Sequence, residues 1–232
     1  MKILSLDTTA EVCSASLCED KKLVAEMTVN TGNTHSETLL PLVEQILKIS
    51  ETALDEVDCF ACSTGPGSFT GVRIGVATVK GLAYGKGKPC VSVSTLEALA
   101  YNLIGYSGII CPVMNDRRNQ VYNALFECCD GVLKRLCSDR ALSIDELDEE
   151  LSSIDKPIYL VGDGYSITER GFKKTKICFV PERQRLQSAY SVACCALEKI
   201  NEGQTLSDSE LVPIYLRPSQ AERERNERLG IK

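Results

Sequence analysis

The sequence predicts an α/β protein made of two similar lobes, each a mixed sheet flanked by helices. The order strand, turn, strand, turn, strand, helix occurs twice, and the two copies start about 105 residues apart. Each copy carries an aspartate in its first turn, Asp7 in the first and Asp116 in the second. A stretch bounded by two glycines at residues 105–108 separates the copies. Together these observations indicate an internal duplication.

The first copy begins with alternating apolar residues, which predict strands at residues 2–6, 12–18 and 23–29. Ser36 is a good helix N-cap, and large apolar residues follow it at helical spacing as far as Leu47. A short buried strand at 59–62, a glycine-rich turn and a helix at 72–84 come next. A strand at 89–93 and a helix at 95–103 complete the copy.

The second copy repeats this order from residue 108. Strands are predicted at 108–114, 121–128 and 132–136, and Asp130-Gly131 supplies a hairpin turn between the last two. A helix follows Ser143, with acidic residues near its start. The remaining elements are strands at 157–161 and 177–180, a helix at 188–201, the segment 213–217 and a charged helix from 219.

Two such lobes around an acidic cleft describe the duplicated actin-like ATPase (ribonuclease H-like) fold, which says little about function by itself. We expect residues 1–104 to form an N-terminal lobe that carries the partner-binding helices. Residues 105–232 are expected to form a second, smaller lobe with a C-terminal helix that returns to the first.

Composition bounds the function. The net charge of −6 and the absence of tryptophan argue against a chain that holds much phosphate backbone or stacks single-stranded bases by itself. No apolar run approaches the ~18 residues of a membrane span, and the chain starts with a strand instead of a leader. We therefore expect a cytoplasmic protein without membrane contact.

The twelve cysteines are interpreted as small core residues, because they sit inside apolar runs. Cys59 and Cys62 are the one pair with metal-ligand spacing, but on a strand they would face opposite sides. A zinc ribbon would need a second such pair.

The stretch from Ser63 to Gly75 reads STGPGSFTGVRIG and joins a strand to a helix. Free N–H groups at such a helix start suit an anion or phosphate. The stretch is neither a P-loop nor a Gly-x-Gly-x-x-Gly fingerprint. Its chemistry is therefore ambiguous on its own.

Five segments in order resemble the TsaB (YeaZ) family, and together they span almost the whole chain. They are Ile3–Thr9, Thr34–Pro41, Gly65–Gly75, Gly162-Asp163-Gly164 and the ending Pro213-x-Tyr215-Leu216-Arg217. The resemblance implies a dimeric, non-catalytic scaffold that activates TsaD, the catalytic and metal-binding paralogue, together with TsaE, an ATPase. That machinery forms N6-threonylcarbamoyladenosine at position 37 of tRNAs reading codons that begin with A. tRNA would then meet this chain only through the complex.

The residues agree with a chain without its own active centre. A TsaD-like metal site needs two histidines on a helix, and this chain has only His35. A serine hydrolase would need a Gly-x-Ser-x-Gly elbow, which is absent. We expect no catalytic residue, no metal and no required cofactor, with any use of ATP at the level of the complex.

The alternative is an independent actin-like ATPase or small-molecule kinase. Asp7 would then help to hold Mg²⁺, and Asp116 or Asp163 would lie near the phosphates. The first turn of each copy, which carries Asp7 or Asp116, contains no glycine. The backbone of these turns is therefore poorly suited to approach a phosphate. If a nucleotide binds, the predicted contacts are Asp7, Thr8, Thr9, Gly162, Asp163 and Gly164.

The first two helices carry more apolar surface than one sheet face covers, which predicts a partner interface. The residues assigned to it are His35, Leu39, Val43, Ile46, Leu47, Gly71, Val72, Gly75, Val76 and Val79. The alternative interpretation is that all of them are core. Near the C-terminus, arginines alternate with glutamates, which favours a solvated helix over a phosphate-binding stripe.

Overall fold

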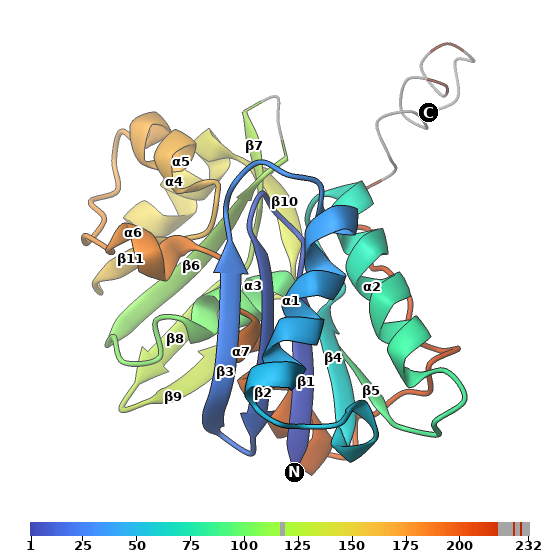
Figure 1. Cartoon of the computed structure of the whole chain (residues 1–232). Helices are drawn as coiled ribbons and strands as arrows, with labels where there is room; N and C mark the ends of the chain where they lie inside the picture. Colours follow the sequence, from blue (N-terminus) through green and yellow to red (C-terminus); the bar gives the residue numbers. More distant parts are fainter. Residues whose placement is uncertain (117–118, 218–224, 226–227, 229–232) are drawn as a thin grey trace.

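The computed structural model describes residues 1–116 and 119–217, together with Arg225 and Arg228. This part of the chain forms two α/β lobes (Figure 1). The charged helix expected from residue 219 lies almost wholly outside the described residues. Arg117 and Arg118, in the first turn of the second copy, also lie outside them.

The first lobe is built on a five-stranded mixed sheet in the order β3-β2-β1-β4-β5. Strands β1 to β3 form an antiparallel meander, whereas β4 runs parallel to β1 and β5 parallel to β4. The bounds are β1 Lys2–Asp7, β2 Cys13–Glu19, β3 Lys22–Val29, β4 Cys59–Ser63 and β5 Cys90–Val93. The predicted meander and both later strands are confirmed.

Two layers of helices cover this sheet, because successive residues of a strand point to opposite faces. Leu4 and Phe60 pack with α1 (His35–Ile49) and α2 (Phe69–Ala83), which lie beside each other on one face (Figure 1). Ile3 and Cys59 pack with α3 (Thr95–Tyr101) and α7 (Ala189–Asn201) on the other. Cys62 lies in the first of these clusters, so Cys59 and Cys62 face opposite sides as their spacing predicts.

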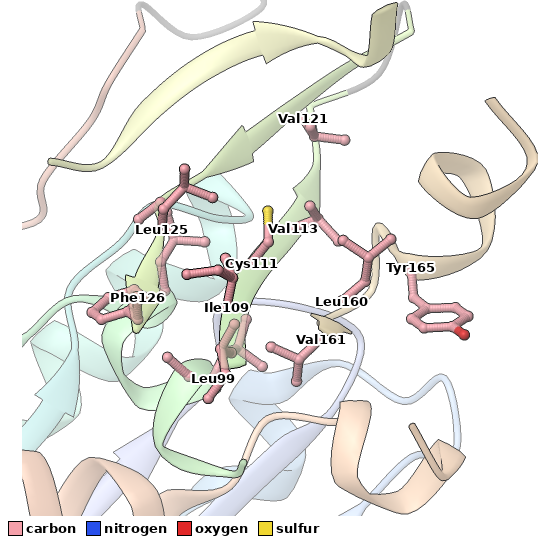
Figure 2. Packing of buried hydrophobic residues seen from close by; sticks show 14 of the residues in the cluster. Leu99, Ile109, Cys111, Val113, Val121, Leu125, Phe126, Leu160, Val161 and Tyr165 are labelled. Carbon is pink, nitrogen blue, oxygen red and sulfur yellow. The ribbon is translucent and has the colours of Figure 1, made fainter. Parts of the chain in front are cut away.

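The second lobe has a sheet in the order β10-β7-β6-β8-β9, and β11 pairs parallel with β6. Its strands are β6 Gly108–Asn115, β7 Gln120–Asn123, β8 Phe126–Cys129, β9 Val132–Arg135, β10 Arg140–Ser143 and β11 Ile158–Val161. Its helices are α4 Ile144–Ser152, α5 Tyr165–Gly171 and α6 Glu182–Arg185. Leu99 of α3 reaches this core and packs with residues of β6 and β11 (Figure 2). Helix α3 therefore belongs to the packing of both lobes.

Several elements of the second lobe differ from the prediction. The strand expected at 121–128 is interrupted between β7 and β8, yet both parts keep one register on β6, with Asn123 opposite Val113 and Phe126 opposite Ile110. On the side away from β6, β7 pairs with β10 and β8 pairs with β9, so the interruption lies where the outer partner strand changes. The sequence did not predict β10. The predicted strand at 177–180 makes only a bridge from Cys178 to Tyr159. Helices α5 and α6 were not assigned from the sequence, and the four residues of α6 are too few to show a period.

The chain returns to the first lobe after the second sheet. Helix α7 packs on the first sheet, and a bridge between Cys90 and Leu206 follows it. A short 3₁₀ turn at Leu54–Glu56 precedes β4.

Nine of the twelve cysteines are buried, as expected for small core residues. Among the described residues, no helix combines the length and the apolar character needed to cross a membrane.

Candidate functional site

The turn after β1 is organised around the buried carboxylate of Asp7, which is only 1% exposed. Ser63 Oγ donates a hydrogen bond to Asp7 Oδ2 at 2.6 Å. The backbone N–H of Thr9 and its Oγ1 both donate to Oδ1, at 2.9 and 2.7 Å. Burial raises the pKa of the Asp7 carboxyl, and the same three hydrogen bonds oppose that effect. The carboxylate thus holds the turn together, the capping role expected for an aspartate there.

The glycines of the Gly65–Gly75 stretch hold α2 against this turn. A Cβ on Gly67 would lie 2.4 Å from the carbonyl oxygen of Thr9, and one on Gly71 would lie 2.0 Å from that of Thr8. A Cβ on Gly75 would come within 2.6 Å of Thr8 Oγ1. Thr8 Oγ1 in turn donates to the carbonyl of Gly71 at 2.7 Å. At these three positions the space of a side chain is therefore filled by backbone and side-chain atoms of Thr8 and Thr9.

The start of α2 is also occupied by the protein itself. Ser68 caps the helix, since its Oγ accepts the N–H of Gly71, and its own N–H donates to the carbonyl of Thr9 at 2.7 Å. A Cβ on Gly65 would lie 2.3 Å from the carbonyl oxygen of Ile214 in the C-terminal segment. The N–H groups of Ser68 and Gly71 at this helix start are thus bonded within the protein.

His35 begins α1 and completes the surroundings of the turn. Its Nε2 lies 2.7 Å from the carbonyl oxygen of Ala10, and its ring lies next to Gly71. The single histidine is therefore a hydrogen-bonding group at a helix start. Within residues 1–116 and 119–217, no cluster of three or more histidine, cysteine, aspartate or glutamate side chains could hold a metal ion.

The Gly162-Asp163-Gly164 turn follows β11 and packs on β6. A Cβ on Gly162, whose φ is +110°, would lie 2.4 Å from the carbonyl oxygen of Val113. Gly164 donates its N–H to the same oxygen at 3.0 Å. Asp163 Oδ1 accepts the N–H of Asn115 at 3.4 Å, so this turn meets the first turn of the second lobe. Both glycines are explained by close backbone packing.

Asp163 differs from Asp7 because its side chain reaches solvent while protein atoms still crowd its carboxylate. This partial loss of water raises its pKa to about 6, and the charge of Glu11 acts in the same direction. Hydrogen bonds from the backbone oppose the shift. The predicted nucleotide contacts thus form two separate turns, one closed on itself and one partly open.

Sequence reasoning missed the role of the C-terminal segment. Arg217 Nη1 contacts Asp116 Oδ2 at 2.8 Å and also donates to the side chain of Gln120. Tyr215 stacks on Phe69 of α2, with ring centroids 4.4 Å apart. The Pro213-x-Tyr215-Leu216-Arg217 pattern was the available signal, but nothing in it indicates which loops it contacts.

The structure places the residues assigned to a partner interface mainly in the core of the first lobe. Those buried are Leu39, Val43, Ile46, Gly71, Val72, Gly75, Val76 and Val79, while His35 and Leu47 are partly buried. The physical reason is that the sheet covers the richest apolar side of each helix, and Gly71 and Gly75 face Thr8. The large apolar side chains exposed there are Leu40 and Ile49 on opposite flanks of α1, 47% and 57% exposed, and Tyr84 directly after α2, 77% exposed.

Comparison with known proteins agrees with the fold and the motifs. The family model described as tRNA N6-adenosine threonylcarbamoyltransferase (TsaD) matches residues 26–224. The chain is 30% identical over 225 residues to the tRNA threonylcarbamoyladenosine biosynthesis protein TsaB of Bacillus subtilis, covering 96% of each chain. It is 29% identical over 224 residues to the TsaB protein of Escherichia coli, covering 95% of this chain and 96% of that one.

Solved structures give the same result. YeaZ from Pseudomonas aeruginosa superposes with a TM-score of 0.75 at 25% identity, covering 93% of this chain and 99% of that one. The fold class expected from the sequence, a duplicated actin-like (ribonuclease H-like) α/β fold, is confirmed. The 30% identity over nearly the whole of both chains, together with the glycine stretch and the Pro213–Arg217 pattern, leads to one conclusion: this chain belongs to the TsaB (YeaZ) family.

Proposed function

We propose that this chain takes part in the biosynthesis of threonylcarbamoyladenosine in tRNA, as a non-catalytic scaffold that activates a TsaD-like partner. The proposal names N6-threonylcarbamoyladenosine at position 37 of tRNAs reading codons that begin with A as the product. The relatives' names, which state this pathway, support the first part. The match of residues 26–224 to the TsaD family model supports kinship with the transferase itself.

The observation that supports a non-catalytic chain is the closed state of Asp7. An aspartate that holds a metal ion, including the Mg²⁺ of a bound nucleotide, presents carboxylate oxygens that are open to that ion. Here Ser63 and Thr9 supply three hydrogen bonds to it, and the side chain is buried. Opening it to a ligand would leave those donors without a partner, which costs about 1–3 kcal/mol each.

The proposed partner surface is the outward side of α1 and α2. Leu40 and Ile49 are exposed on opposite flanks of α1, and Tyr84 is exposed directly after the last residue of α2. Scattered exposed apolar residues are ordinary, so the proposal rests on the position of α1 and α2 beside each other on one face of the first sheet. We propose that this surface binds a second copy of the chain in isolation and a TsaD-like paralogue in the complex, with a TsaE-like ATPase as third component. The chain itself requires no cofactor in this proposal.

The deciding experiment is reconstitution of threonylcarbamoyl transfer to tRNA from purified TsaD-like and TsaE-like partners of the same organism, with and without this chain. We expect modified tRNA only when this chain is present. ATP turnover by this chain alone is measured in parallel, because it separates the scaffold from the actin-like ATPase or kinase alternative. Full transfer without the chain, or sustained ATP hydrolysis by the chain alone, would contradict the proposal.

A further inference from the structure

The C-terminal segment from Pro213 to Arg217 contacts both lobes within five residues. On the first lobe, the N–H of Ile214 donates to the carbonyl of Thr64 at 2.8 Å, directly after β4. The absent side chain of Gly65 makes room for the carbonyl of Ile214. The segment therefore lies against the loop between β4 and α2, which also packs on the Asp7 turn.

Tyr215 fixes the segment to the first turn of α2. Its ring lies almost parallel to that of Phe69, with an interplanar angle of 8°. Arg73 Nε donates to the Tyr215 hydroxyl at 2.8 Å, and the guanidinium carbon lies 5.6 Å from the centre of the tyrosine ring. Stacking, a hydrogen bond and a cation–π contact thus meet on one side chain.

Two residues later the chain reaches the second lobe. Leu216 packs against the second-lobe core, and Arg217 pairs with Asp116, whose side chain is only 6% exposed. The guanidinium also binds Gln120, so it joins the two ends of the turn between β6 and β7. A charge-assisted bond to a buried carboxylate is strong and directional. The second anchor is thus as specific as the first.

From these contacts we propose that residues 213–217 are an interlobe strap, which couples the β4–α2 loop of the first lobe to the β6–β7 turn of the second. The strap connects the aromatic anchor at Tyr215 to the ion pair at Arg217 through a single residue. Loosening either anchor therefore releases the other. This inference does not depend on the proposed function.

The test is amide hydrogen exchange of the full-length chain, measured in variants that cut one anchor at a time. Arg217→Ala removes the second-lobe anchor, and Tyr215→Leu removes the first-lobe anchor. Arg183→Ala is the matched control, because Arg183 is an exposed arginine of α6 outside the strap. The amides to follow are those of Thr64 and Ser68 in one lobe and of Asn115 and Asp116 in the other.

If the strap couples the lobes, each variant speeds exchange at the distant anchor at least tenfold, as well as at its own. The Arg183→Ala control leaves both sites unchanged. If Arg217→Ala affects only the second-lobe amides and Tyr215→Leu only the first-lobe amides, the two contacts are independent and the strap is refuted. Arg217→Lys, which keeps the charge but loses the fork that reaches Asp116 and Gln120 together, gives the same reading should the alanine variant not fold.

Discussion

Gly71 of α2 lies against Thr8 so closely that a Cβ on the glycine would come within 2.0 Å of the threonine carbonyl oxygen. The contact is reciprocal, because Thr8 Oγ1 donates to the carbonyl of Gly71 at 2.7 Å. The most distinctive stretch of the sequence is thus the place where helix α2 docks on the turn after β1. Its glycines are required by backbone contact between elements more than sixty positions apart in the sequence.

This contact predicts that Gly71→Ala destabilises the protein. The added methyl would overlap backbone that the Asp7 network holds in place, so we expect a loss of about 3 kcal/mol in the free energy of unfolding. Gly81→Ala is the control on the same helix, because nothing lies within 4 Å of its Cβ position. That variant should gain about 0.5–1 kcal/mol from reduced chain entropy. Urea unfolding of both variants measures the difference, and equal stability would contradict the packing argument.

Val76 and Ala77 are neighbours on α2 with opposite surroundings, the first 3% exposed and the second open to solvent. Val76→Arg places a charge in the first-lobe core, so we expect an unfolded or aggregated chain. Ala77→Arg should fold with an ordinary thermal transition. If the outward side of α2 binds a partner, it should also abolish the dimer or the complex, as read by light scattering and co-purification. A folded Ala77→Arg chain that assembles normally would place the interface elsewhere.

Asp163 should give the stability a pH dependence of defined sign. Its folded pKa is about 6, above the ~3.9 of an aspartate in an unfolded chain, so the native state holds the proton more tightly than the unfolded chain. The stabilisation from that proton is complete below about pH 4 and is lost as the pH rises towards 6. Asp163→Asn removes this dependence, so its stability relative to the wild type should improve between pH 4 and pH 7. Chemical unfolding at both pH values tests this, with Asp155→Asn as an exposed control.

The charge of the chain predicts weak tRNA binding. With a net charge of −6, the isolated protein should bind tRNA more weakly than about 1 µM at physiological salt, because few phosphate counterions can be released. Fluorescence anisotropy with labelled tRNA measures the affinity, and adding the TsaD-like partner serves as the positive arm. Submicromolar binding by the chain alone would show that it contacts tRNA directly.

The sequence alone determined the class of fold and the order of most elements. Alternation along residues 2–29 defined the meander, and the repeated order with Asp7 and Asp116 revealed the duplication. These features are local, since strand and helix periods are readable within one segment. The same holds for the opposite orientation of Cys59 and Cys62, which follows from an odd spacing on a strand.

The tertiary structure decided what those residues contact. Val76 and Ala77 look alike in the sequence, but only the position of the sheet makes one core and the other surface. The glycine stretch suits an anion by its sequence, whereas in the structure its glycines lie against Thr8 and Thr9 of the first turn. The ion pair of Arg217 likewise depends on the fold, because its partner Asp116 lies about a hundred positions away in the sequence. Periodicity carries no information about such long-range contacts, because they depend on how separate elements pack together.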